Sequence, residues 1–89
     1  MSEGQRRVLL APAAQRQLRR LPPGDAARLR GPILALALDA DPAGAVKLAG
    51  SDFWRLRVGE LRVIYVVPDA ETVVVLRVAR RAESTYRRL

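Results

Sequence analysis

The chain has 89 residues, 49% of them hydrophobic, so it is long enough to form one domain with a core and too short to form two. Cysteine and histidine are both absent, which excludes disulfides, thiolate metal sites and any mechanism that depends on a histidine base or ligand. The 16 lysines and arginines outnumber the 9 aspartates and glutamates, and the net charge of +7 favours a polyanionic partner, either nucleic acid or an acidic protein. We therefore predict a single basic domain over residues 1–89 that uses no metal and no cofactor.

The N-terminal half predicts one short strand followed by two helices. Residues 7–10 (Arg-Val-Leu-Leu) are typical of a strand, and Pro12 then opens a helix at a position where its missing N–H is not needed. Apolar residues at helical spacing continue this helix to the Pro-Pro-Gly run at residues 22–24. A second helix is predicted over residues 25–40, with an aspartate in its first turn. Pro32 lies inside it and predicts a kink or a break.

The C-terminal half predicts strands joined by tight turns. A connecting loop over residues 45–52 leads to a strand at residues 54–58, where apolar residues alternate with arginines. The dipeptide Gly59-Glu60 is a turn signal, and residues 61–67 form the second strand of the hairpin.

A third strand over residues 71–79 is apolar on both faces, as expected for an interior strand, and residues 80–89 are expected to form a loop or a short helix. The predicted fold is therefore α+β, in the order β-α-α-β-β-β with a short C-terminal segment. In this fold an antiparallel sheet carries a two-helix hairpin on one face, and the other face is open to a partner.

Arginines at alternating strand positions mark that open face. Arg55 and Arg57 lie two residues apart on one strand and point to the same side, away from the core. Arg62 joins them across the hairpin if the register allows it. The predicted members on or beside this face are Arg55, Arg57, Arg62, Arg77, Arg80 and Arg81. Because a guanidinium binds phosphate through two N–H groups, this face predicts a phosphate-bearing ligand; the alternative is the solvated face of a half-buried sheet.

Other conspicuous residues have simpler interpretations. The arginines of the first helix, Arg16, Arg19 and Arg20, are interpreted as a solvated face, and Trp54 and Tyr65 as core residues. The apolar run at residues 8–11 is too short for a signal peptide or a membrane span, so we expect a cytosolic protein without a membrane partner.

Several motifs occur in a fixed order along nearly the whole chain. They are a K-L-x-G loop at residues 47–50, the stretch W-R-L-R-V-G-E-L-R-V-I-Y at residues 54–65, and a terminal R-R at residues 80–81 followed by Tyr86. Together with the order of elements, they resemble the RelE/ParE superfamily of toxins from type II toxin–antitoxin systems.

The resemblance implies one of two activities. RelE-like members are endoribonucleases that cut mRNA, commonly on the ribosome, whereas ParE-like members share the fold and inhibit DNA gyrase. The positions that match the working residues of RelE-like nucleases are Arg55, Arg57, Arg62, Arg81 and Tyr86, which favours an endoribonuclease that inhibits translation. The alternatives are a ParE-like gyrase inhibitor and a catalytically inactive RNA-binding member.

Under the nuclease hypothesis, the 2′-OH of the RNA attacks the adjacent phosphate, displaces the 5′-oxygen of the next nucleotide and leaves a 2′,3′-cyclic phosphate. Arg57 and Arg62 are predicted to clamp the phosphate, and Arg81 to stabilise the phosphorane or the leaving oxygen. Because an arginine is almost never neutral at neutral pH, Tyr86 is predicted to act as the base or to orient the 2′-OH, with Glu60 or Glu83 as the fallback base.

The remaining predicted RNA-binding residues are Arg55, Lys47, Arg77 and Arg80. The expected partners are mRNA, the ribosome and an acidic antitoxin that covers the cationic face.

Overall fold

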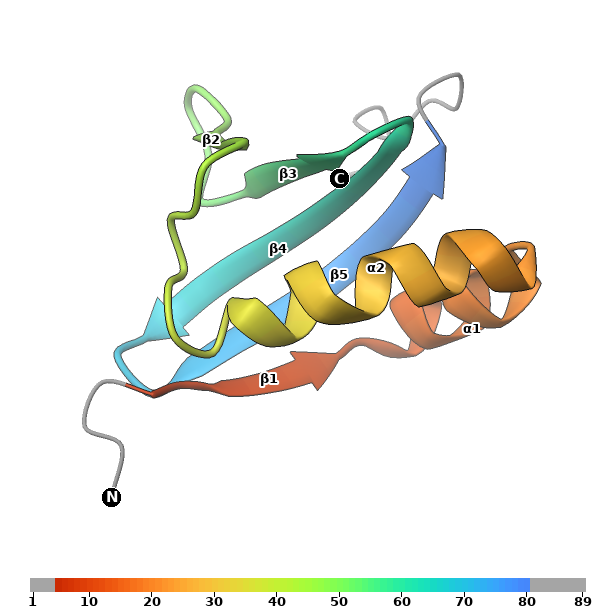
Figure 1. The fold of residues 1–89 in the computed structure, drawn as a ribbon. Coiled ribbons are helices and arrows are strands. Elements are labelled where there is room, and N and C mark those ends of the chain that lie inside the picture. The colour runs from red at the N-terminus through yellow and green to blue at the C-terminus, as the bar shows by residue number, and fades with distance from the viewer. Residues whose placement is uncertain (1–4, 81–89) are drawn as a thin grey trace.

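A mixed sheet with two helices on one of its faces makes up the part of the chain that the computed structural model describes, residues 5–80 (Figure 1). The elements in chain order are β1 (Arg7–Leu10), α1 (Pro12–Arg20), α2 (Pro23–Ala35), β2 (Ala45–Lys47), β3 (Trp54–Val58), β4 (Leu61–Asp69) and β5 (Thr72–Arg80). The strands lie in the order β1-β5-β4-β3-β2. β1 runs parallel to β5, and the other neighbouring pairs are antiparallel. This arrangement confirms the predicted α+β fold and adds the strand β2, and the sheet is mixed rather than antiparallel because β1 runs parallel to β5.

Both helices begin at a proline. Pro12 and Pro23 occupy the first helical positions of α1 and α2, where no backbone donor is required. α2 contains Pro32 and continues past it, so the helix does not break there. It ends at Ala35 rather than at residue 40, because the chain tightens into i→i+3 hydrogen bonds from the N–H groups of residues 36–38. No helix within residues 5–80 is long and apolar enough to cross a membrane.

The additional strand is β2, which lies in the segment predicted as a connecting loop. Its residues 45–47 pair antiparallel with β3, with Val46 opposite Arg55. The carbonyl of Gly44, a residue with φ of 91°, accepts a hydrogen bond from the N–H of Arg57 just before the strand begins. A strand this short has no periodicity of its own, and only pairing with β3 defines it.

The core fills the space between the helices and the sheet. α2 contributes Leu29 and Ile33, and Leu36 directly follows the helix; all three pack against buried residues of β3, β4 and β5. Tyr65 of β4 is fully buried, its hydroxyl donates to the carbonyl oxygen of Ala40 at 2.7 Å, and its ring stacks on that of Trp54 with the centroids 6.1 Å apart. The core assignments of these two aromatic residues are therefore confirmed.

Candidate nucleic-acid interface

Four arginines share the face of the sheet that lies opposite the helices. Arg57 lies opposite Arg62 across the β3–β4 hairpin, and Ile64 lies between Arg55 on β3 and Arg77 on β5. Directly opposed residues of neighbouring strands point to the same side of a sheet. We call this surface the arginine face and define it by Arg55, Arg57, Arg62 and Arg77. The register therefore brings together four of the predicted residues.

The alternate residues of the same strands belong to the core. Leu56, Val63 and Val78 are opposed to one another across β3, β4 and β5, and all three are buried beneath the helices. This row lies between the two arginine-bearing rows, as the two-residue period of a strand requires. The predicted division of β3 into a core side and an arginine side is confirmed.

An irregularity in β5 turns Arg77 onto the arginine face. Tyr65 is opposite Val75 while its neighbour Ile64 is opposite Arg77, so Leu76 is an extra residue in β5. Strict alternation from the buried Val75 would have turned Arg77 toward the helices. The extra residue shifts the alternation of side chains by one position, so that Arg77 points away from the helices and Val78 is buried.

Arg57 and Arg62 differ in exposure although they lie opposite each other. Arg57 is exposed, whereas Arg62 is only 7% exposed. Nη1 of Arg62 donates to the carbonyl oxygens of Leu61 at 3.2 Å and of Gly59 at 3.4 Å. These hydrogen bonds hold the guanidinium of Arg62 against the backbone beside the hairpin turn, whereas Arg57 is exposed to solvent.

Two predicted RNA-binding residues lie elsewhere. Arg80 is opposite Leu61, a core residue, and its guanidinium pairs with the carboxylate of Asp25 on α2. Lys47 is opposite Trp54 and therefore lies on the helix side of the sheet. The expectation that Arg80 joins the arginine face is wrong, because side chains alternate along β5 and Arg80 points to the side opposite to Arg77. Arg81, Glu83 and Tyr86 lie outside the described residues.

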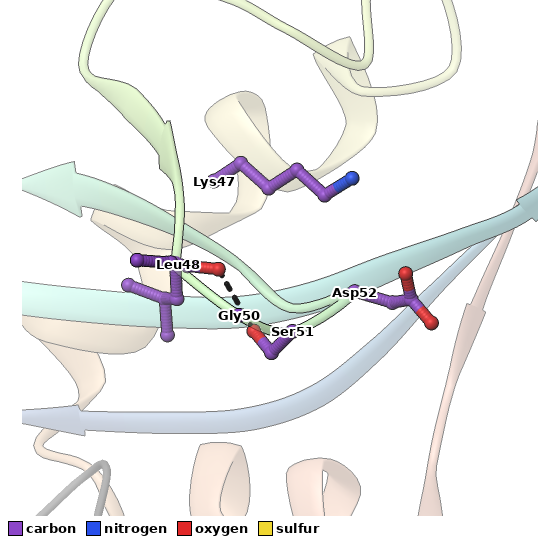
Figure 2. Close-up of a pocket in the computed structure, with 6 residues that line it drawn as sticks. Lys47, Leu48, Gly50, Ser51 and Asp52 are labelled. Atoms are coloured by element: carbon purple, nitrogen blue, oxygen red, sulfur yellow. Dashed lines mark hydrogen bonds between the residues drawn. The ribbon is translucent and has the colours of Figure 1, made fainter.

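Lys47 instead borders a pocket of about 480 Å³ formed by the loop after β2 (Figure 2). The lining residues are Lys47, Leu48, Ala49, Gly50, Ser51 and Asp52. The hydroxyl of Ser51 donates to the carbonyl oxygen of Leu48 at 3.0 Å and accepts from the N–H of Phe53 at 3.2 Å, which closes the loop on itself. A single loop with one cation offers far less to a polyanion than the arginine face does.

A comparison with protein families gives one match. The family model of the ParE toxin of type II toxin–antitoxin systems, parDE, matches residues 8–85. The chain belongs to this toxin family. The match confirms the resemblance to the RelE/ParE superfamily that the motifs predict. Comparison with curated protein sequences finds no match.

Solved structures of related toxins share the fold. A chain of the archaeal RelE–RelB complex from Pyrococcus horikoshii superposes with a TM-score of 0.76 and 25% identity over 90% of this toxin and 99% of that chain. A chain of the RelBE2 toxin–antitoxin complex from Mycobacterium tuberculosis superposes with a TM-score of 0.67 and 28% identity, over 86% of this toxin and 99% of that chain. The isolated E. coli RelE toxin superposes with a TM-score of 0.73 and 20% identity, over 86% of this toxin and 85% of that chain. At this identity the similarity shows a shared fold and nothing more.

Two contacts between the helices and β5 have no counterpart in the sequence predictions. Asp25 was assigned only to the start of a helix, yet it binds Arg80 across the helix–sheet boundary. Gln17 of α1 accepts a hydrogen bond from the N–H of Val78 at 2.8 Å and so ties α1 to β5. Neither contact has a local signal, because the paired residues are 55 and 61 positions apart.

Proposed function

We propose that this toxin is an endoribonuclease of the RelE kind, which cleaves mRNA on the ribosome in the cytoplasm and so inhibits translation. The observation that carries the proposal is the convergence of four arginines on the sheet face without helices. Like charges repel, so this arrangement favours an anion that bridges them. A single-stranded RNA supplies phosphates at regular intervals, and guanidinium groups bind them through paired N–H donors.

The exposures of the arginines suggest different roles in the reaction. Arg57 contacts the scissile phosphate directly and stabilises the extra negative charge that develops when the 2′-OH attacks. Arg62, whose guanidinium donates to the carbonyl oxygens of Gly59 and Leu61, adds a second positive charge beside Arg57 and takes part in the same clamp. Arg55 and Arg77 flank Ile64 and bind neighbouring phosphates.

Proton transfer needs a residue other than arginine, because the pKa of a guanidinium lies above about 12. We propose Tyr86 as the base or as the group that orients the 2′-OH, and Arg81 as the group that stabilises the phosphorane or the leaving oxygen. Glu60, exposed in the hairpin turn beside the arginine face, is the alternative base among the described residues.

The proposed protein partner is an acidic antitoxin that covers the arginine face. The solved relatives from P. horikoshii and M. tuberculosis are toxin–antitoxin complexes. An acidic segment that binds the same guanidinium groups as RNA would prevent both from binding together. Co-expression with the neighbouring gene is expected to yield a complex that single-stranded RNA cannot enter.

A second candidate function is inhibition of DNA gyrase, which the match to the ParE family model favours. Such a toxin would leave mRNA intact and raise the response to DNA damage. A catalytically inactive RNA-binding member would produce neither effect. The three functions therefore differ in mRNA cleavage and in the response to DNA damage, and both can be measured in one culture.

The test is induction of the toxin followed by mapping of mRNA 5′ ends and measurement of a DNA-damage reporter. We expect mRNA cleavage within minutes and no change in the reporter. Arg57→Ala is expected to reduce cleavage about 100-fold, the effect of removing one donor to a transition-state oxyanion. Arg16→Ala removes the same charge from the exposed face of α1 and serves as the control. Intact mRNA together with a raised reporter would favour the gyrase hypothesis.

A further inference from the structure

A series of contacts joins the helix layer to the arginine face at one end of the sheet, where β5 ends and β3 turns into β4 (Figure 1). It starts at Asp25 in the first turn of α2. The carboxylate pairs with Arg80 at the end of β5 and with Nη1 of Arg28, one turn along α2, at 3.6 Å. The side chain of Asp25 is 14% exposed, against 50% for Arg80 and 58% for Arg28. Asp25 is therefore the least exposed member of the cluster and pairs with both arginines.

Arg28 in turn lies against the β3–β4 turn. A Cβ atom at Gly59 would come within 2.7 Å of Nη2 of Arg28, so the guanidinium occupies space that a glycine leaves free. Gly59 has φ of 60°, as the first central residue of a two-residue hairpin turn often requires. The carbonyl of the same glycine accepts the hydrogen bond from Arg62. One turn residue thus contacts an arginine of the helix layer and an arginine of the arginine face.

This arrangement connects Asp25 to a surface that it does not touch. Arg57 and Arg62 are directly opposed in register, and Nη1 of Arg62 donates to two carbonyl oxygens, that of Leu61 in β4 and that of Gly59 in the turn. Gly59 also contacts Arg28, and Arg28 pairs with Asp25, so an unbroken series of contacts runs from Asp25 to Arg62.

We propose that Asp25 is a positioning residue for the arginine face. Through Arg28 and Gly59 it fixes Arg62 beside Arg57, and through Arg80 it fixes the end of β5 that follows Arg77. The expected effect of Asp25 on RNA binding rests on the proposed function, whereas its expected effect on the placement of Arg62 does not.

The first test is the affinity for a single-stranded 2′-O-methyl RNA, which lacks the attacking hydroxyl and cannot be cleaved. Asp25→Asn keeps the shape of the side chain and raises the net charge by one, so electrostatic attraction alone predicts tighter binding. The positioning role predicts the opposite sign, an affinity weakened about threefold to tenfold. Asp25→Glu retains the carboxylate and is expected to recover most of the loss.

The matched control is Asp52→Asn, which makes the same change of charge at an exposed aspartate of the loop after β2. We expect this variant to bind the RNA as tightly as the unchanged toxin or slightly more tightly. If Asp25→Asn also binds as tightly or more tightly, Asp25 does not position the arginine face.

The second test follows the contacts themselves by NMR. Asp25→Asn is expected to shift the side-chain Nε–H signal of Arg62 and the amide signal of Gly59, and Asp52→Asn to leave both unchanged. Arg28→Gln removes the residue that links Asp25 to Gly59 and is expected to produce the same shifts. This variant therefore provides the test if Asp25→Asn does not fold. Unmoved signals in a folded variant would overturn the inference. If the unchanged toxin fails to bind the RNA, the proposed function fails, and the NMR result still decides the role of Asp25.

Discussion

The centre of the sheet face beneath the helices is apolar, with Lys47 and Arg80 at its ends, whereas the opposite face carries the four arginines of the arginine face. Both faces are made by the same strands. On β3, Leu56 is 4% exposed and its neighbour Arg57 is exposed to solvent. The pleat of a strand separates two requirements, burial and anion binding, by one residue. Stability and ligand binding can therefore be changed almost independently at adjacent positions.

The largest expected effect is on stability, at Leu56. Leu56→Ala leaves a cavity beneath the helices and is expected to lower the free energy of unfolding by about 2 to 5 kcal/mol. Arg57→Ala, one residue along β3, is expected to change it by less than about 1 kcal/mol, because the side chain is exposed. Urea unfolding of both variants measures the difference. Equal losses would mean that the two faces are not separable.

A second prediction concerns Tyr65 on the core face. Burial, together with the negative charges of Asp41 and Asp39, raises the pKa of Tyr65 from 10.0 to about 12. The unfolded chain loses this proton near pH 10 and the folded chain near pH 12, so the stabilisation is complete below pH 10 and is lost as the pH rises between these values. The loss amounts to about 2 to 3 kcal/mol. Tyr65→Phe should remove this component of the alkaline loss, which urea unfolding at pH 9 and pH 12 can check.

The smallest expected effect is a change in how strongly the RNA affinity of the arginine face depends on salt concentration. The logarithm of the RNA affinity is expected to fall linearly with the logarithm of the salt concentration, by about 0.7 for each phosphate that the toxin neutralises. Arg57→Gln or Arg77→Gln should reduce the slope by about that amount. Arg16→Gln, on α1, should leave it unchanged. Titrations at several salt concentrations provide the slopes, and a reduced slope for Arg16→Gln would place RNA on the helices as well.

Most of the fold could be predicted because its signals are local. The alternation in residues 54–58 predicts both the strand and the side on which Arg55 and Arg57 lie, and Gly59 marks the turn that follows. The end of α2 was predicted too late, since apolar spacing continues to residue 40 although the hydrogen bonding changes after Ala35. The strand β2 was missed because three residues are too few to show a period.

The sequence by itself determined the α+β class, most of the element order, the toxin superfamily and the arginine-rich character of β3, because periodicity, turn residues and motif order act over short stretches of chain. Only the tertiary structure decided which arginines share a surface. The bulge at Leu76 turned Arg77 toward Arg55, and regular alternation after it put Arg80 on the helix side, where it pairs with Asp25. These outcomes depend on the register between strands and on contacts between residues far apart in the chain, for which no local pattern exists.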